Sequence, residues 1–321
     1  MKYIALIPSY EPDNKLLSLV NKLIDNKFIV IVVNDGSSKK YDDVFNKLDK
    51  KCIYLKYDNN MGKGYALKYG YKYINSNYSD YIVVTMDCDG QHRIEDAIKL
   101  CDYVSDNPYT LCLGKRLRGE FTPLRSRVGN GITKLVFYLS TGTKIYDTQT
   151  GLRCFSNKIM DYNLKIPGNR FEYEMNVLLN LSKNNIDVHE IEIETIYFDN
   201  NKGSHFNTIK DSFKIYKEIL LFSLSSIIIN IMDLVMYILF TFIFNSYISN
   251  IISKLVSFGL KYIFNRKNIL KYIIFSILLI IINTGLLELL IYLGFNKFLS
   301  KVIVEIGLYF ILLFSGIRKR F

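Results

Sequence analysis

The sequence predicts an α/β domain with a mostly parallel sheet, followed by an all-α bundle of four transmembrane helices. In residues 1–210, short apolar runs alternate with stretches of helical character, which is typical of parallel strands covered by helices on both faces. In residues 211–321, four apolar blocks each reach or approach the ~20 residues that a helix needs to cross a bilayer. We therefore expect two domains, 1–210 and 211–321.

Five strands are expected in the first domain, because five runs are apolar throughout rather than alternating. They are KYIALIP (2–8), FIVIVVNDGSS (28–38), CIYLKY (52–57), DYIVVTMD (80–87) and YTLCLGKR (109–116), with helices expected near 14–26 and 64–74. Ligands of such sheets bind beyond the carboxyl ends of the strands. Four polar residues follow strand ends and should line one crevice: Tyr10, Asp35, Asp87 and Asp89.

The segment MDCDGQH (86–92) carries the sharpest chemical signal. Asp87 and Asp89 lie within about 7 Å of each other along an extended segment, where they repel unless a cation or a basic side chain lies between them. Gln91 adds a third oxygen, and hard cations such as Mg²⁺ or Mn²⁺ take oxygen ligands. The segment predicts a Mg²⁺ or Mn²⁺ site made by Asp87, Asp89 and Gln91, with His92 packing beside it.

Two other loops permit two interpretations each. Asp35-Gly36-Ser37 is either a turn that caps a helix or a ligand contact in the crevice. NNMGKG (59–64) is either a loop that enters a helix, or a phosphate site at a helix N-terminus that uses Lys63.

Composition narrows the classes of partner. The net charge is +11, but the lysines form no stripe or arginine-rich tract, so a nucleic-acid partner is not expected. Positive loops beside a membrane and anionic, phosphorylated substrates explain the charge better. Five cysteines without CxxC spacing are expected to be reduced core residues. The first strand is preceded by no secretory signal, so the first domain is expected to be cytoplasmic.

Five segments in order resemble the motifs of a known family: IPSYEP, VVNDGSS, NNMGKGYALKYG, MDCDGQH and DTQTGLRCF. They are similar to those of family-2 glycosyltransferases of the polyprenyl-phosphate, dolichyl-phosphate mannose synthase-like branch, over roughly 3–210. The resemblance implies a GT-A fold, a Rossmann-like mostly parallel sheet, with a nucleotide-sugar donor and a divalent metal. Two positions depart from the family: Asn34 replaces one of two paired aspartates, and Pro12 replaces an acidic residue whose role Glu11 or Asp13 would take.

The same resemblance, with the charges that follow the fifth strand, assigns the candidate site residues. The nucleotide-sugar residues would be Pro8, Tyr10, Glu11, Asp35, Lys63 and Asp87. The catalytic residues would be Asp87, Asp89, Arg116 and Arg127, and the acceptor phosphate would meet Arg125, Arg127 and Lys202. A lone arginine is usually a solvated surface charge. Basic residues clustered near 115–127, joined by Arg153, suit an anionic acceptor or the departing diphosphate.

The acceptor also follows from acid–base chemistry. A sugar hydroxyl needs a general base, because its pKa is far above 7. A phosphate monoester is already largely a dianion, since its second pKa is near 6. The sequence offers no obvious histidine–carboxylate base, which favours a polyprenyl phosphate acceptor. In the helix that opens at GNRFEYEMN (168–176), Arg170, Glu172 and Glu174 are catalytic, position the acceptor or lie on the helix surface, and the positioning role is preferred.

The second domain is expected to cross the bilayer four times, at about 219–245, 247–264, 270–294 and 298–317. Positive residues precede the first block, separate the second from the third and end the chain, which predicts cytoplasmic termini. Only Lys297 and Lys301 are expected at an opposite bend. KLVSFGLKYIFNRK and the basic end resemble a GtrA-like module, a family associated with translocation of lipid-linked sugars. Asp233 lies within an apolar run and should pair with Lys254.

The leading hypothesis is a membrane-anchored transferase that moves a sugar from a nucleoside-diphosphate sugar to polyprenyl phosphate. A lipid-linked sugar transporter (flippase) component is the alternative from another class, and the two can coexist in one chain. A processive polysaccharide synthase is a third, although such enzymes usually carry Gln-x-x-Arg-Trp and this chain has no tryptophan. A non-catalytic sugar-nucleotide sensor is disfavoured by the Asp87–Gln91 cluster. A homo-oligomer is left open.

Overall fold

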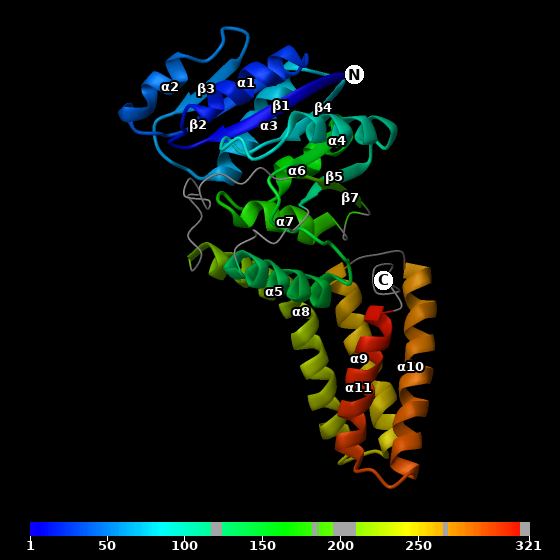
Figure 1. Cartoon of the computed structure of the whole chain (residues 1–321). Helices are drawn as coiled ribbons and strands as arrows, with labels where there is room; N and C mark the ends of the chain where they lie inside the picture. The colour runs from blue at the N-terminus through cyan, green and yellow to red at the C-terminus, as the bar shows by residue number, and fades with distance from the viewer. Residues whose placement is uncertain (117–123, 182–183, 185, 195–209, 266–268, 315–321) are drawn as a thin grey trace. The chain divides into compact units, whose positions relative to one another are not determined.

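The computed structural model describes residues 1–116, 124–181, 184, 186–194, 210–265 and 269–314. Within the helices, the side chains of 124–130, 132, 210–212, 220–227, 263–265, 269, 271 and 313–314 fall outside this description. The chain divides into two compact units (Figure 1). The first unit is Met1–Tyr138 with Lys144–Ile219, and the second is Leu139–Thr143 with Leu220–Phe321.

The first unit is built on a seven-stranded sheet in the order β3-β2-β1-β4-β6-β5-β7. The strands are β1 (Lys2–Ser9), β2 (Ile29–Asp35), β3 (Ile53–Tyr57), β4 (Tyr81–Thr85), β5 (Thr110–Arg116), β6 (Arg153–Ser156) and β7 (Asp187–Ile193). Every pairing is parallel except the two that β6 makes with β4 and β5. The five predicted strands are present. β6 and β7 were not predicted.

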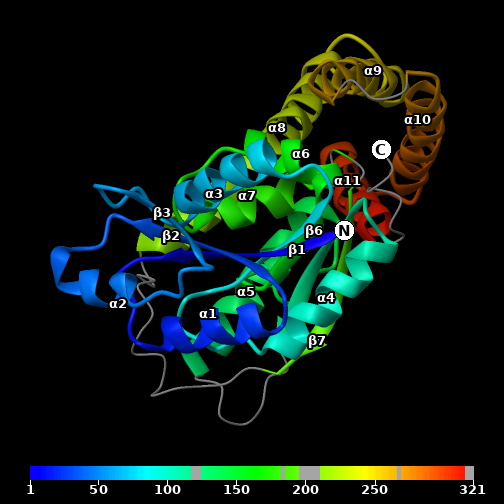
Figure 2. The same ribbon diagram turned by 90° about the horizontal axis from the view of Figure 1, so that it is seen from above.

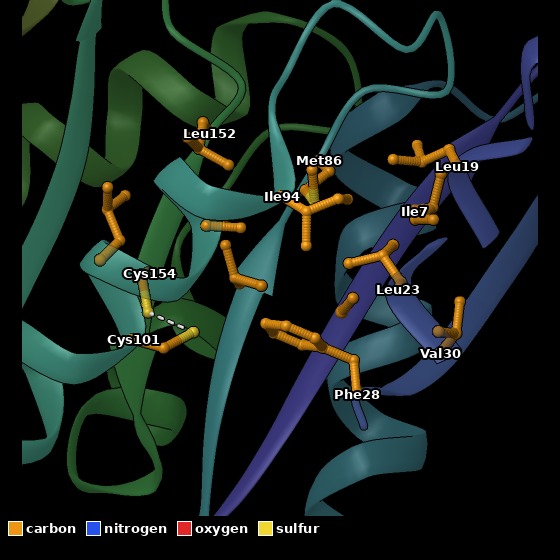
Figure 3. Close-up of a cluster of buried hydrophobic side chains, with 14 of the residues drawn as sticks. Ile7, Leu19, Leu23, Phe28, Val30, Met86, Ile94, Cys101, Leu152 and Cys154 are labelled. Carbon is orange, nitrogen blue, oxygen red and sulfur yellow. Dashed lines mark hydrogen bonds between the residues drawn. The ribbon is translucent and has the colours of Figure 1, made fainter. Parts of the chain in front are cut away.

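Helices cover both faces of this sheet (Figure 2). The covering helices are α1 (Lys15–Asp25), α3 (Lys63–Asn77) and α4 (Ile94–Asp106), and α6 (Met160–Lys165) and α7 (Glu172–Leu181) contact α3. The other helices are α2 (Asp42–Asn46) and α5 (Leu124–Thr141), with short 3₁₀ turns η1 (Lys39–Tyr41) and η2 (Asn157–Ile159). On one face, Leu23 of α1 and Ile94 of α4 pack with Ile7 and Val30 (Figure 3). On the other face α3 lies so close that a Cβ at Gly70 would be 2.4 Å from Leu6.

The buried cysteines belong to this core. Cys101 of α4, Cys112 of β5 and Cys154 of β6 are free and buried, and the sulfurs of Cys101 and Cys154 lie 3.7 Å apart (Figure 3). Cys52 and Cys88 are free and half-buried. The expected reduced cysteines are therefore present, three of them packed as small apolar residues.

The antiparallel strand β6 shapes the functional edge of the sheet. Arg153, its first residue, is paired with Thr85 at the carboxyl end of β4 and with Leu113 of β5. Because β6 runs against its neighbours, it begins where they end. The segment that leads into β6, residues 147–152, therefore reaches the edge at which ligands of parallel sheets bind.

The second unit consists, in its described part, of helices joined by short turns. It contains the rest of α8 (Lys210–Phe240) after Ile219, and α9 (Ser246–Asn265), α10 (Ile269–Tyr292) and α11 (Lys297–Phe314). Among the described residues one helical stretch, Tyr272–Tyr292, is long and apolar enough to cross a membrane, and Ile228–Phe240 is a shorter apolar stretch. Polar residues interrupt the apolar runs of α9 and α11, so the fourfold crossing stays a prediction.

Burial in this unit is reversed relative to a water-soluble bundle. Ile274, Ile281 and Ile311 are 61%, 64% and 60% exposed, whereas Asn250 and Lys301 are fully buried. Lys301 was expected near a bend and is instead inside the unit. An exposed aliphatic exterior around a polar interior is the pattern expected of helices that face lipid.

Candidate active site

Asp87, just after β4, is the centre of a cluster of charged side chains. Lys63 Nζ lies 2.7 Å from Asp87 Oδ1, and His92 Nε2 lies 3.4 Å from Oδ2. Partial burial would raise the pKa of Asp87, but the charge of Lys63 and the hydrogen bond from His92 hold it well below its usual range. A Cβ at Gly151 would lie 2.2 Å from Asp87 Oδ2, so this carboxylate leaves no space for a side chain there.

The structure places a basic side chain, Lys63, beside Asp87 of the aspartate pair. Lys63 is the first residue of α3, following Gly62, whose φ is 99°. Its ammonium group lies between Asp87 and Glu174 of α7, 3.1 Å from Glu174 Oε2. Burial lowers the pKa of Lys63, but the two carboxylates more than reverse this and raise it. Lys63 is therefore a permanently charged link between the β4 edge and α7.

Asp89 differs from Asp87 in its surroundings. Its Oδ1 accepts the backbone N–H of Gln91 at 3.0 Å, and Gly90 between them has φ 74°. Burial and the neighbouring charge of Asp87 raise the pKa of Asp89. Asp89 therefore carries negative charge that is incompletely compensated, which is the electrostatic condition that favours a bound cation.

The donor set fits a hard divalent cation. Asp87, Asp89 and Gln91 provide two carboxylates and an amide, the oxygen chemistry that Mg²⁺ and Mn²⁺ prefer when substrate phosphates and water complete the shell. Within the described residues, no three histidine, cysteine, aspartate or glutamate side chains gather as a metal site. A cation here would accordingly depend on Gln91 and on ligands from the substrate.

Asp35, at the end of β2, organises the loop that precedes α3. It is buried, and it accepts hydrogen bonds from the backbone N–H groups of Met61 (2.8 Å) and Gly62 (3.0 Å) and from the Tyr57 hydroxyl (2.8 Å). The Asn60 amide donates to it as well, at 3.2 Å. Asp35 thus holds the loop that presents Lys63. A contact between Asp35 and a ligand stays a prediction.

The ends of β1 and β2 are tied together beside it. The Glu11 N–H donates to Ser37 Oγ at 2.9 Å, and Ser38 Oγ donates to Glu11 Oε1 at 3.4 Å. Asn34 Oδ1 accepts the Ser37 N–H at 2.9 Å. Asn34, where the family often has aspartate, thus shapes this turn without adding charge. Tyr10 follows β1. Burial, and to a smaller extent the charge of Glu11, raise the pKa of Tyr10.

Pro8 completes the predicted nucleotide-sugar residues. It lies within β1, paired in register with Val33 of β2. Pro8 lies two residues before Tyr10, at the same carboxyl edge of the sheet as Asp87.

Arg116, at the end of β5, is held by a residue that the sequence did not single out. Its Nε and Nη2 donate to the two carboxylate oxygens of Asp147 at 2.6 and 2.9 Å. Asp147 is buried, and its own N–H donates to Glu190 Oε1 at 2.9 Å. Bidentate pairing fixes the plane of the guanidinium. Asp147 opens the DTQTGLRCF motif, so this motif orients Arg116 at the edge of the sheet.

Arg153 corrects a prediction. It was grouped with the basic residues that would meet an anion, but it is 5% exposed. Its donors reach the carbonyl oxygens of Thr150 (2.9 Å), Glu174 (2.8 Å) and Thr148 (3.3 Å). Arg153 therefore holds the 148–151 loop against α7, the loop whose Gly151 backs Asp87.

The acceptor residues can be placed only in part. Arg125 and Arg127 lie in α5, with side chains outside the described residues, and Lys202 lies outside them altogether. Glu174, by contrast, was noticed in the sequence without its partner. Glu174 contacts Lys63, which is 111 residues away in the sequence. Local sequence patterns could not predict this contact.

Comparisons with known proteins identify the family. Residues 4–164, half of the chain, match the profile of glycosyl transferase family 2. A UDP-N-acetylglucosamine–dolichyl-phosphate N-acetylglucosaminyltransferase of Methanococcus voltae is 27% identical, covering 70% of this chain and 96% of that protein. A dolichyl-phosphate beta-glucosyltransferase of Saccharomyces cerevisiae is 26% identical, over 68% and 72%. An uncharacterized protein of Methanocaldococcus jannaschii is 30% identical, over 56% and 75%.

Solved structures share the fold of the first unit. Mannosyl-3-phosphoglycerate synthase from Rubrobacter xylanophilus has a TM-score of 0.51 at 13% identity, over 69% of this chain and 73% of that one. Glucosyl-3-phosphoglycerate synthase of M. tuberculosis has a TM-score of 0.50 at 12% identity, over 69% and 80%. Both support a GT-A-like fold. The chain belongs to glycosyl transferase family 2, and the protein is a glycosyltransferase.

Proposed function

We propose that this glycosyltransferase moves a sugar from a nucleoside-diphosphate sugar to polyprenyl phosphate. The observation that carries the proposal is the arrangement of Lys63, Asp87 and Asp89 at the carboxyl edge of the sheet. It offers a site for a cation-bound diphosphate, the leaving group of such a donor. Two relatives are named for transfer to dolichyl phosphate, which supports a lipid phosphate as the acceptor.

The donor would lie across the ends of β1, β2 and β4. Pro8, Tyr10, Glu11 and Asp35 form the nucleoside side of this edge, and Asp35 acts by holding the loop before Lys63. Asp87, Asp89 and Gln91 would hold Mg²⁺ or Mn²⁺, which would neutralise the diphosphate as it leaves. Lys63 keeps Asp87 ionised and fixed for that task.

The transfer itself needs little from the protein beyond alignment. A phosphate oxygen of the acceptor forms a bond to the anomeric carbon while the bond from that carbon to the nucleoside diphosphate breaks. No proton has to move, because the acceptor phosphate is already ionised. Arg116, fixed by Asp147, would face the developing charge, and Arg125, Arg127 and Lys202 would receive the acceptor phosphate.

We infer that the helical unit anchors the enzyme in a bilayer. Its exposed aliphatic surface, with Ile274, Ile281 and Ile311 among the exposed residues, supports contact with lipid. The expectation of four spans, cytoplasmic termini and a GtrA-like module belongs to this proposal. A second function, movement of the lipid-linked sugar, is favoured by one observation, the buried charges of Asp233, Lys254 and Lys301.

The experiment is a transfer assay on membranes that contain the full-length protein. Radiolabelled nucleotide sugars would be supplied one at a time with polyprenyl phosphate, and the lipid product would be extracted into organic solvent. Label should enter the lipid with one or a few donors, and Asp89→Asn membranes should lose it. Label that enters only water-soluble sugars, or full activity in excess chelator, would refute the lipid acceptor or the metal respectively.

A further inference from the structure

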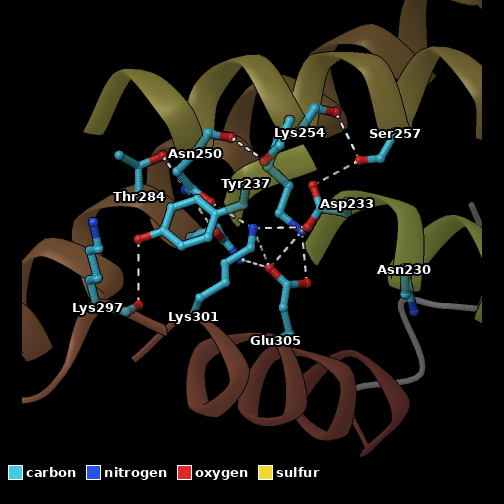
Figure 4. Close-up of polar contacts among 12 residues, drawn as sticks. Asn230, Asp233, Tyr237, Asn250, Lys254, Ser257, Thr284, Lys297, Lys301 and Glu305 are labelled. Carbon is cyan, nitrogen blue, oxygen red and sulfur yellow. Dashed lines mark hydrogen bonds and ion pairs between the residues drawn. The ribbon is translucent and has the colours of Figure 1, made fainter. Parts of the chain in front are cut away.

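Four charged side chains meet inside the helical unit, and we call them the buried tetrad: Asp233 of α8, Lys254 of α9, and Lys301 and Glu305 of α11 (Figure 4). Lys254 Nζ lies 3.1 Å from Asp233 Oδ2 and 2.7 Å from Glu305 Oε1. Lys301 Nζ lies 2.8 Å from the same Asp233 oxygen and 3.1 Å from the same Glu305 oxygen. Two ammonium groups therefore share two carboxylates.

Stability alone does not explain the tetrad. Replacing buried ion pairs by apolar residues of similar volume is often neutral or stabilising, because taking the charges out of water costs as much as their attraction returns. The side chains of Asp233 and Lys301 are 2% and 0% exposed. Ionisable groups retained at such depth among apolar helices are a functional site by default.

The two carboxylates are not equivalent. The side chain of Asp233 is 2% exposed, whereas that of Glu305 is 26% exposed. Glu305 Oε1 receives three donors from three helices, since the Asn283 amide of α10 donates to it at 2.9 Å beside the two lysines. Three convergent donors, two of them charged, form a cradle for one anionic oxygen.

Contacts that do not involve Glu305 also hold the two lysines of the cradle. Lys254 and Lys301 both remain paired with Asp233. Lys301 also donates to Asn250 Oδ1 at 2.7 Å, and Asn250 donates in turn to Asn283 at 2.9 Å. All four helices, α8 to α11, are thereby linked by contacts that do not involve Glu305, and the partly exposed Glu305 is the member that can leave.

We propose that Glu305 is a resident anion in a binding site for a lipid phosphodiester, whose phosphate oxygen replaces the Glu305 carboxylate between Lys254 and Lys301. With Glu305 displaced, two lysines face one aspartate and the cradle carries one net positive charge. A phosphodiester carries one negative charge and neutralises it, whereas a phosphate monoester is largely a dianion at neutral pH. The lipid-linked sugar that the proposed transfer produces is a phosphodiester, so this assignment of the ligand rests on the proposed function.

The test measures binding of a defined probe to the full-length protein in phosphatidylcholine nanodiscs. The probe is a radiolabelled short-chain prenyl phosphosugar, compared with the matching prenyl monophosphate and with inorganic phosphate. Glu305→Gln, which removes the competing charge, should tighten diester binding by about tenfold, and Lys301→Met should weaken it by about tenfold, the effect typical of one charged hydrogen bond. Glu288→Gln is the matched control, since Glu288 bonds to Ser246 outside the tetrad.

Lys301→Met leaves Asp233 with fewer partners and could prevent folding, so the double variant Asp233→Asn/Lys301→Met accompanies it. Equal diester binding by the wild type, Glu305→Gln and the double variant would overturn the site. Full competition by nanodiscs containing phosphatidylglycerol would overturn the phosphosugar assignment, because any lipid diester would then suffice. Transfer is assayed separately. Loss of transfer chemistry with retained tetrad-dependent binding would refute the proposed function while the anion site stands.

Discussion

Lys63 Nζ and Asp87 Oδ1 lie 2.7 Å apart, and this contact makes the helix that begins at Lys63 part of the catalytic edge. The same ammonium group reaches Glu174 Oε2 at 3.1 Å. One cation thereby fixes Asp87, a proposed ligand of the metal, and ties it to a buried carboxylate of α7. Four expected outcomes test this site, and each isolates one of its contacts.

Lys63→Met should weaken both activity and stability, because it removes the ammonium group shared by Asp87 and Glu174 and leaves them only the more distant His92 (3.4 Å) and Arg153 (3.6 Å). Breaking a buried pair costs about 3 kcal/mol, less where a partner is partly exposed, as Asp87 is. Chemical denaturation of the full-length protein would measure the loss. Lys63→Met/Glu174→Gln should recover stability without activity. Equal stability of the single variant and the wild type would contradict the role given to Lys63.

Asp89→Asn should remove most activity and yet raise the melting temperature of the metal-free protein. The substitution removes a negative charge that would bind the metal cation, and the loss of such a group costs about 100-fold in rate. The pKa of Asp89 is raised in the folded protein, so its ionisation opposes folding once the pH rises above its ordinary range near 4. The melting temperatures of variant and wild type should converge at pH 3.5 and diverge by pH 7. Asp106→Asn, at the exposed last residue of α4, is the control.

Asp87 predicts the opposite dependence on pH. Its pKa is depressed in the folded protein, so its contribution to stability is full above the ordinary aspartate pKa and is lost as the pH falls below about 4. Asp87→Asn should accordingly flatten the acid limb of a plot of stability against pH. Thermal unfolding between pH 2.5 and 6 would measure it. An unchanged acid limb would mean that Asp87 is not held by Lys63 in solution.

Gly151→Ala should impair transfer by moving Asp87, since its Cβ would lie 2.2 Å from Asp87 Oδ2. Displacement of a catalytic group by an ångström costs on the order of 100-fold in rate. Steady-state kinetics of Gly151→Ala would be compared with Gly131→Ala, where a Cβ meets nothing within 4 Å. Wild-type kinetics in Gly151→Ala would show that the loop moves freely away from Asp87.

The sequence could predict the parts of this site that a strand and its following loop determine. Asp87 and Asp89 were recognisable because an apolar run ends directly before them, and Lys63 because glycines surround it. Its partner Glu174 was not recognisable as such, because their contact depends on how α7 packs against α3. β6 and β7 were not predicted because neither is a long apolar run. β6 has only four residues, and β7 (DVHEIEI), at the edge of the sheet, alternates polar and apolar residues.

In the helical unit, too, the sequence predicted one contact and missed another. Asp233 was predicted to pair with Lys254, and the two lie 3.1 Å apart, which confirms the pairing. The sequence predicts Lys301 near a bend, because it lies close to the start of the fourth apolar block, 298–317. In the structure Lys301 and Glu305 form an ion pair within one helix, and that pairing accompanies the burial of Lys301.

Under the proposed membrane anchoring, the tetrad also bears on how the helices would enter the bilayer during synthesis. A lone charge at the centre of a helix costs about 3 kcal/mol to release into lipid. α11 can reduce that cost by itself, through the Lys301–Glu305 pair, whereas Asp233 and Lys254 need each other across two helices. α8 and α9 should consequently leave the ribosome-bound insertion channel as a hairpin rather than one after the other. The buried charges of the helical unit would then determine the order in which its helices enter the bilayer.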